Sequence, residues 1–309
     1  MISFGDMKIT ILISTYNGAK YLREQLDSLY SQTLIDNIDF LVRDDGSTDG
    51  TQEILEEYRK THKNFNWYQG ENKRPARSFW ELLNKVSGAD YYAFSDQDDV
   101  WDKDKIEVAI NELEQLDVKK PLLYMSDVHV VDAELNHVAD GFVDTNVPVN
   151  YACSLSNSIC PGCTFVFNEE VRKLAIRFDA EEYIDHHDWT LYKIVACFGE
   201  VIFDKTTHMG YRQHGDNAIG AKSGLTKYWD MIFKKPNDPK FIHQRMKNAL
   251  ALEKYFGELM SEENRYLTHL MAHYTEDKKI KKALLKEKRF KYSTAQFMYL
   301  KFLVRTNKL

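Results

Sequence analysis

The stretch Tyr91–Trp101, with the sequence YYAFSDQDDVW, places three carboxylates directly after an apolar run. The run Tyr91–Ser95 predicts a buried strand. Asp96, Asp98 and Asp99 repel one another, and one interpretation is that a divalent cation neutralises them. Oxygen ligands suit Mg²⁺ or Mn²⁺, which keep positions open for the phosphate oxygens of a nucleotide. The alternative is an ordinary acidic turn before a helix.

Alternating strands and helices surround this stretch. Apolar runs bounded by turn residues predict strands, and apolar residues spaced three or four apart predict helices. Such a chain forms right-handed crossovers in a mainly parallel sheet, and ligands bind beyond the carboxyl ends of the strands. We therefore expect an α/β fold with its acidic motifs at one sheet edge. The predicted strands cover residues 8–14, 38–42, 65–68 and 91–95, and the helices cover residues 19–32, 51–60 and 78–86.

The second half of the chain is less regular. We expect the same sheet to continue to about residue 214, followed by long helices. A soft boundary at Lys222–Leu225 divides the chain into an expected nucleotide-binding and catalytic domain, residues 1–222, and a helical C-terminal region, residues 223–309. Predicted strands here cover residues 122–125, 164–167 and 201–203, and predicted helices cover residues 189–197, 241–260 and 262–291, with a last helix near the end.

Composition indicates a globular chain. Its 309 residues, 43% of them hydrophobic, can bury a sizeable core. No run approaches the roughly 20 apolar residues of a membrane span, and the segment Ile9–Ile13 lacks a signal-peptide cleavage site. These features predict a cytoplasmic protein. Cys160 and Cys163 have the spacing of a redox or zinc pair, but no second pair completes a zinc site, so we expect loop thiols.

The C-terminal tail is strongly basic although the net charge of the chain is −6. Residues 278–309 hold 11 Lys or Arg against the single acid Glu287, an excess of +10 that leaves −16 on the rest. A basic amphipathic helix followed by an apolar patch suits an anionic membrane surface, here the inner face of the plasma membrane. The alternative is a helix whose apolar face packs on its own domain. Nucleic acid is not an expected partner, because the acidic body repels phosphate.

A second acidic motif, DDGSTDGT, follows the strand at residues 38–42. Its carboxylates Asp44 and Asp45 can accept hydrogen bonds from a pyrimidine ring or a ribose. Capping of the next helix is the alternative role of this motif. The loop STYNG, residues 14–18, lies at the same sheet edge. Arg77 lies at the start of the helix that precedes the acidic strand. Its side chain contacts either a diphosphate or only solvent.

Two later motifs place histidine beside a charged residue. In HHDW, Asp188 is either a helix cap or a general base that takes the proton from a substrate hydroxyl. Its two histidines also suggest zinc, but neighbouring side chains point apart on regular structure. In YRQHG, Arg212 can reach a diphosphate or its metal, and His214 can be a third metal ligand.

Taken in order, the segments ITILISTYNGAKYLREQLDSLYSQT, LVRDDGSTDGT, FSDQDDVW, HHDW and YRQHG resemble the family 2 glycosyltransferases over roughly residues 8–217. The forms SDQDDVW, HDW and YRQH look like those of bacterial rhamnosyltransferases that build capsules and rhamnose-rich wall polysaccharides. The resemblance implies a GT-A fold, a nucleotide-diphosphate sugar donor, a Mn²⁺ or Mg²⁺ ion and inversion at the anomeric carbon. The implied acceptor is a lipid-linked oligosaccharide or a polysaccharide.

The resemblance also implies roles for individual residues. Two positions depart from the family pattern: His187 stands where many members have Glu, and CPGCT replaces a Gly-Gly-containing acceptor loop. Carried over by motif, Asp96 and Asp98 form the metal and diphosphate site, Asp44 and Thr15 contact the base or ribose, Asp188 is the catalytic base and His214 supports the metal-bound diphosphate. We also predict His214 as a metal ligand, His187 and Trp189 on the acceptor side, and as further donor-binding residues Tyr16, Asn17, Asp45, Arg77 and Gln97.

Rival functions stay open at this point. The donor is dTDP-rhamnose or a UDP-linked galactose, glucose or N-acetylglucosamine. DQDDV, residues 96–100, also satisfies the nucleophile pattern of haloacid-dehalogenase phosphatases, but that motif normally lies on the first strand of its domain. A nucleotidyltransferase would need a Gly-rich phosphate loop. A non-catalytic sugar or nucleotide binding module has no need of a base such as Asp188.

Overall fold

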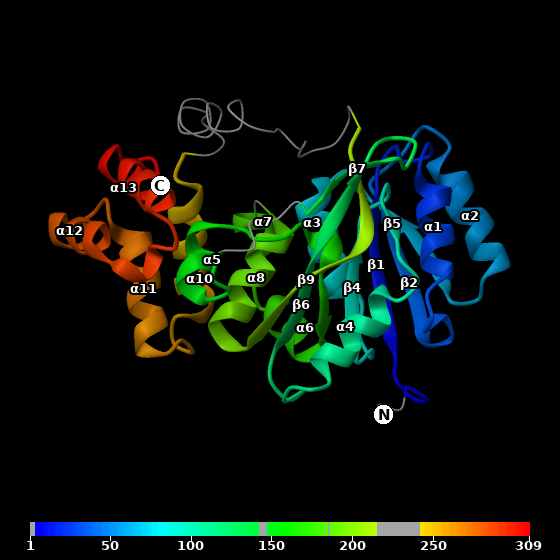
Figure 1. Cartoon of the computed structure of the whole chain (residues 1–309), viewed down its shortest axis with the longest axis horizontal. Helices are drawn as coiled ribbons and strands as arrows, with labels where there is room; N and C mark the ends of the chain where they lie inside the picture. Colours follow the sequence, from blue (N-terminus) through cyan, green and yellow to red (C-terminus); the bar gives the residue numbers. More distant parts are fainter. Residues whose placement is uncertain (1–3, 142–146, 185, 215–241) are drawn as a thin grey trace.

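The computed structural model describes residues 4–141, 147–184, 186–214 and 242–309. The predicted boundary at Lys222–Leu225 lies outside these residues. Of the described residues, those before the boundary include the long strand β9 near their end, and those from 242 onward form helices and the turns between them (Figure 1).

A nine-stranded sheet forms the centre of the molecule (Figure 1). Its strand order is β3-β2-β1-β4-β8-β6-β9-β5, and β7 pairs with β6. The four longest ladders are parallel, while β8 runs antiparallel to both β4 and β6 and joins the two halves. The strands are β1 Ile9–Thr15, β2 Ile38–Asp44, β3 Phe65–Gln69, β4 Tyr91–Ser95, β5 Val100–Trp101, β6 Leu122–Val131, β7 His137–Asp140, β8 Val166–Asn168 and β9 Glu200–Arg212.

Helices cover both faces of this sheet, because successive side chains of a buried strand point to opposite faces. Tyr91 and Ala93 pack in one core with α1, α2 and α4, whereas Tyr92 and Phe94 pack in the other with α3, α6 and α8. The helices of this part are α1 Leu22–Tyr30, α2 Thr51–Thr61, α3 Arg74–Lys85, α4 Lys105–Leu113, α5 Tyr151–Ser156, α6 Glu169–Ala175, α7 Ala180–Tyr183 and α8 His187–Phe198, with short 3₁₀ turns at η1 Ile35–Asn37 and η2 Gly162–Thr164.

Several predicted elements differ from the observed ones. The strand predicted at residues 164–167 begins at Val166, because η2 occupies Gly162–Thr164. The strand predicted at residues 201–203 extends over all of β9, since it pairs with β6 along its length. Helix α3 begins at Arg74, so Arg77 lies inside its first turn.

The C-terminal helices are α10 Gln244–Phe256, α11 Glu262–His273, α12 Lys278–Lys286 and α13 Thr294–Arg305, with η5 Lys288–Phe290. The single helix predicted at residues 262–291 is wrong, because Asp277 caps a new helix by accepting a hydrogen bond from Lys279 N at 2.6 Å. The helix predicted at residues 241–260 is shorter and ends before Gly257.

Most apolar side chains of the basic tail face inward. Phe297, Leu300 and Val304 of α13 are buried in the same core as α3 and α8, so this face packs on its own protein. Met298 and Phe302 remain exposed on the other side of α13. Among the described residues, no helix is both long enough and apolar enough to cross a membrane.

Candidate active site

The carboxyl ends of β1, β2 and β4 meet at one edge of the sheet. Thr15 pairs with Asp44 at the ends of β1 and β2, and Ser95 ends β4 on the other side of β1. The loops that follow these strands are therefore neighbours. Gln97 joins two of them, because its Oε1 accepts from Tyr16 N at 2.8 Å and its Nε2 donates to Tyr16 O at 3.1 Å.

The loop after β2 is built around the buried carboxylate of Asp44. This carboxylate accepts hydrogen bonds from Thr15 Oγ1 at 2.9 Å, Ser47 N at 2.9 Å and Gln52 Nε2 at 2.8 Å, and also from Ser47 Oγ and Gly46 N. A carboxylate offers about four lone-pair positions, so these donors use its capacity. Asp44 and Thr15 thus organise the loop, and their contact with the base or ribose of a nucleoside stays a prediction.

An open hollow of about 710 Å³ lies beside this loop. Asp45 on its wall is ion-paired with the buried Arg43 and accepts a hydrogen bond from Lys73 N at 3.0 Å. Tyr16 is 49% exposed and presents an aromatic ring to the same space. A ring for stacking beside a fixed carboxylate is suited to a nucleoside. The residues that line the hollow are Tyr16, Asp45, Gly46, Gln69, Gly70, Glu71 and Asn72.

Asn17 connects the loops after β1 and β2. Its backbone N donates to Ser47 Oγ at 2.8 Å, and its side-chain Oδ1 accepts from Thr48 N at 2.9 Å. Asn17 therefore supports the wall of the hollow and is not among the residues that line it.

The acidic loop after β4 brings two of the three predicted metal ligands, Asp98 and His214, into contact, whereas the ligand atoms of Asp96 converge with those of Asp99 and Cys163. Asp98 Oδ2 lies 2.9 Å from Nε2 of His214, which follows the far end of β9. Burial, then the charge of Asp98, then that of Asp188 raise the pKa of Asp96. Burial and the charge of Asp98 likewise raise the pKa of Asp99. Carboxylate oxygens with one imidazole are a donor set that fits Mn²⁺ or Mg²⁺, and a cation there relieves the repulsion.

Asp99 faces inward below this loop. Its carboxylate accepts from Arg212 N at 3.0 Å, and its ligand atoms lie within 4.8 Å of those of Asp96 and Cys163. Lys105 is buried nearby, donates to Cys163 O at 2.9 Å, and burial lowers its pKa to about 7. Asp99 therefore belongs to the support of the loop. The predicted isolated loop thiol at Cys163 is instead a buried neighbour of the acidic cluster.

Arg212 fastens the acidic loop from below. Its guanidinium donates to Asp98 O at 2.7 Å and Ala133 O at 2.6 Å, and it pairs with Glu24 at 2.5 Å. The side chain is only 1% exposed, so it holds the loop and does not extend to a diphosphate. The YRQHG motif drew attention to Arg212. The residues that Arg212 contacts lie far away in the sequence, so no local pattern indicated its structural role.

Asp188 lies at the start of α8, opposite the acidic loop. Its charge is close enough to raise the pKa of Asp96. Gly162 of the CPGC segment packs against this turn, since a Cβ there would lie 3.0 Å from Asp188 Cβ and 2.6 Å from His187 Nε2. The segment therefore shapes the position of Asp188.

The two residues beside Asp188 point inward. His187 stacks on Phe79 with ring centroids 4.2 Å apart, and burial lowers its pKa to about 4. Trp189 is buried, and its Nε1 donates to Ser154 O in α5 at 2.6 Å. Both rings therefore anchor the first turn of α8, and the acceptor-side roles of His187 and Trp189 stay predictions.

Arg77 of α3 contacts residues of α7. Its Nη2 donates to Glu181 O at 2.9 Å, and its Nε lies 3.7 Å from the Glu181 carboxylate. These contacts join α3 to α7, and the contact of Arg77 with a diphosphate stays a prediction.

The mainly parallel sheet with helices on both faces, and the hollow and acidic loop at the carboxyl ends of its strands, are typical of the GT-A fold of glycosyltransferases. Residues 10–169, about half of the chain, match the family described as Glycosyl transferase family 2, and the chain belongs to that family. The predicted fold class, family and enzyme class are confirmed.

Known proteins with similar sequence or structure agree with this assignment. The dTDP-rhamnosyl transferase RfbG of Shigella flexneri is 32% identical over 222 residues, which cover 68% of this chain and 74% of RfbG. The crystal structure of S. aureus TarS 1-349 in complex with UDP-GlcNAc has a TM-score of 0.55 at 16% identity, covering 98% of this chain and 93% of TarS. The mannosyltransferase PcManGT from Pyrobaculum calidifontis, in complex with GDP-Man and Mn²⁺, has a TM-score of 0.51 at 17% identity over 97% of this chain and 86% of that one.

Proposed function

We propose that this glycosyltransferase is metal-dependent and inverting, and that it moves L-rhamnose from dTDP-rhamnose to a hydroxyl of a growing capsular or cell-wall polysaccharide. The observation that carries the choice of sugar is the similarity to the rhamnosyl transferase RfbG across most of both chains. The second candidate is transfer from a UDP-linked hexose or N-acetylhexosamine, which the fold shared with TarS favours.

The nucleoside of the donor occupies the hollow beside Tyr16 and Asp45. Tyr16 stacks on the base, and the fixed carboxylate of Asp45 accepts hydrogen bonds from the base or the ribose. Gln97 connects Tyr16 to the acidic loop, so the diphosphate of the same donor extends toward Asp98.

Asp96, Asp98 and His214 would hold the Mn²⁺ or Mg²⁺ ion. When bound, such an ion offsets the negative charge that grows on the departing diphosphate. Arg212 keeps Asp98 in place through its backbone oxygen, and Asp99 receives the backbone N–H of Arg212. The metal-ligating carboxylates are thus presented on a loop that the backbone and the side chain of Arg212 both hold in place.

Asp188 acts as the general base. It takes the proton from the acceptor hydroxyl while that oxygen bonds to the anomeric carbon and the bond from that carbon to the diphosphate breaks, which inverts the configuration. His187 and Trp189 fix the turn that carries Asp188 by packing inward. A carboxylate held in this way suffers little reorientation during the reaction.

The exposed basic face of the tail adds a proposed partner. Lys278, Lys279 and Lys282 are exposed on α12, and Met298 and Phe302 are exposed on α13. Anionic lipid headgroups attract such lysines, and the two apolar side chains can enter the interface. Peripheral binding at the inner face of the plasma membrane brings the enzyme to a lipid-linked acceptor.

A thermal-shift screen of dTDP-rhamnose, UDP-glucose, UDP-galactose and UDP-N-acetylglucosamine, each with and without Mn²⁺, tests this proposal. A donor that binds the folded state raises the melting temperature, so we expect the largest shift with dTDP-rhamnose and Mn²⁺. Release of dTDP on adding a polysaccharide acceptor then reports transfer. If only a UDP-sugar stabilises the protein, the rhamnose assignment is wrong and the second candidate holds.

A further inference from the structure

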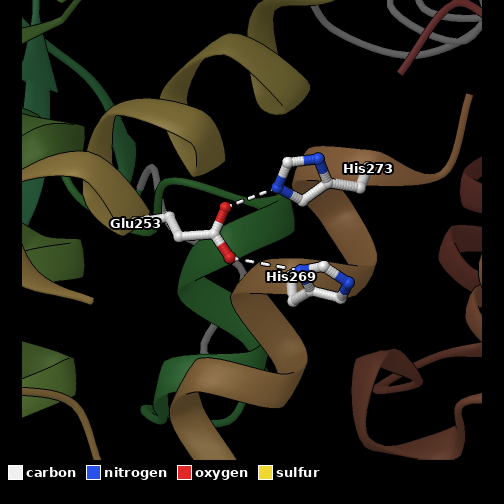
Figure 2. A group of neighbouring side chains, drawn as sticks. All are labelled: Glu253, His269 and His273. Atoms are coloured by element: carbon white, nitrogen blue, oxygen red, sulfur yellow. Dashed lines mark hydrogen bonds and ion pairs between the residues drawn. The ribbon is translucent and has the colours of Figure 1, made fainter. Parts of the chain in front are cut away.

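Helices α10 and α11 carry a second group of metal-ligating side chains, far from the acidic loop in the sequence. Figure 2 shows Glu253 of α10 directed toward His269 and His273 of α11. The two histidines are four residues apart, so they lie one turn apart on the same helix face. Their ring centroids are 4.6 Å apart.

The three side chains converge through their ligand atoms. Glu253 Oε1 lies 3.2 Å from His269 Nδ1, and Glu253 Oε2 lies 2.5 Å from His273 Nε2. One ligand atom of each residue falls within 4.8 Å of the others. Glu276 lies on the far side of His273, with Oε2 2.9 Å from Nδ1, and so fixes the orientation of that imidazole.

We propose that Glu253, His269 and His273 form a binding site for a transition-metal ion, with Zn²⁺ as its best occupant. Two imidazoles and one carboxylate, completed by water, are a common tetrahedral zinc set. A carboxylate on the outer nitrogen of a ligating histidine, as Glu276 provides, is a regular feature of such sites. Imidazole-rich sites favour Zn²⁺, whereas the carboxylate-rich loop at Asp98 favours Mg²⁺ or Mn²⁺, so the two sites select different ions.

The helices already hold the ligands in place without an ion. Leu252 and Phe256 of α10 and Leu270 and Met271 of α11 are buried in the core on either side of the cluster. An ion between the helices therefore costs little reorganisation and cross-links them.

The cross-link would also support the active site. The Nε of Arg245, in the first turn of α10, donates to Ser156 O at 2.9 Å, and its guanidinium lies 5.5 Å from the ring of Trp189. Trp189 adjoins Asp188. Zinc at the other end of α10 would thus stabilise the helix that packs behind the turn carrying the base.

The rival arrangement is metal-free, with His273 protonated between Glu253 and Glu276. Zinc titration of the full-length, untagged protein separates the two. Isothermal titration is done in an Asp98→Ala background, which weakens the acidic loop as a competing site. We expect one high-affinity Zn²⁺ site in this parent, and a rise in melting temperature on adding Zn²⁺.

The Zn²⁺ affinities of single variants then show which side chains bind the ion. Glu253→Gln, which keeps the shape of the side chain, and His269→Ala, at a partly exposed position, should each lower Zn²⁺ affinity more than tenfold. Glu276→Gln should lower it by about tenfold, the usual effect of losing an outer partner. His137→Ala is the matched control, because His137 forms an exposed pair with Asp140 at 2.6 Å and has no second histidine in contact within the described residues.

Two results would overturn the proposal. One is a parent that shows no zinc-dependent heat or melting shift. The other is equal Zn²⁺ affinity in the parent, Glu253→Gln and His269→Ala proteins, each with a native circular dichroism spectrum. Neither result bears on donor binding, which is measured separately with Mn²⁺.

Discussion

His214 Nε2 lies 2.9 Å from Asp98 Oδ2, which connects the end of β9 to the loop after β4 across 116 residues of sequence. The contact means that the proposed metal site is completed only when strand β9 is in place. It also gives the site one imidazole among its carboxylates. The first prediction tests this pair.

Asp98→Ala should abolish the Mn²⁺-dependent stabilisation by the donor, because a main ligand is lost. Donor at a hundred times its Kd stabilises the parent by about 2.7 kcal/mol, and this gain should vanish in the variant and in the parent treated with EDTA. Thermal shift with and without Mn²⁺ measures it. Asp36→Ala, an exposed acid before β2, is the control and should behave as the parent. Unchanged Mn²⁺-dependent binding in Asp98→Ala would remove Asp98 from the site.

Asp188→Asn should reduce turnover by roughly a hundred- to ten-thousand-fold, the usual contribution of a general base. Donor affinity should stay near that of the parent, since the amide has the same shape and the donor-binding loops are unchanged. Initial rates at saturating donor and a donor titration measure the two effects. Full turnover in Asp188→Asn would mean that another group takes the proton.

Arg212→Ala should destabilise the fold by about 3 kcal/mol and raise the KM for the donor, because a buried cation is removed from Glu24 and from the backbone of the acidic loop. Denaturant unfolding and steady-state kinetics measure these changes. Arg59→Ala is the matched control, since Arg59 and its partner Glu56 lie at the surface and the loss of this ion pair should leave stability close to that of the parent. If Arg212→Lys matches the parent in both stability and KM, the several hydrogen bonds of the guanidinium are not required to hold the acidic loop, and a positive charge alone is enough.

The buried imidazole of His187 should lower the free energy of unfolding of the protein as the pH falls into the mildly acidic range. Its pKa is lowered to about 4 in the folded state from 6.5, so the unfolded chain takes up a proton near pH 6.5 that the folded chain refuses. Stability from this group is complete above pH 6.5 and is lost, by up to about 3 kcal/mol, as the pH falls to 4. Denaturant unfolding between pH 7 and 4 measures the slope. His187→Leu should flatten it, and His137→Asn, at an exposed site, should not.

Co-sedimentation with anionic vesicles should fall as salt rises, because the lysines of α12 act through a screened surface potential. Met298→Ser with Phe302→Ser should weaken binding further, since these are the exposed apolar side chains of α13. Neutral vesicles serve as the control. Binding that ignores both salt and lipid charge would contradict a basic-tail interaction.

The first half of the fold followed from the sequence because each buried strand there is an apolar run ended by turn residues. Strand β9 was foreseen only in part, since Asp204 and Lys205 interrupt its apolar pattern and its pairing with β6 is long-range. The break between α11 and α12 was missed because helical spacing continues through Tyr274, and the cap by Asp277 is a local competitor.

The candidate site was predictable where a motif places charges together and not where burial decides the role. Asp44 and Asp45 are adjacent acids, yet one is closed inside its loop and the other lines the hollow. Arg212 and Trp189 are held by partners distant in sequence, so their inward positions left no local pattern. His269 and His273 had a visible H-x-x-x-H spacing, but Glu253 comes from another helix.

The shared core of the C-terminal helices and the catalytic sheet has a consequence for engineering. Phe297 and Leu300 of α13 are buried together with Phe79 of α3 and Leu191 of α8. The last helices of this enzyme are therefore not an interchangeable cassette. A chimera that exchanges only the last helices for those of a relative would leave mismatched volumes in this shared core, first at α5, which contacts both α10 and α11, and the graft would need that helix redesigned with it.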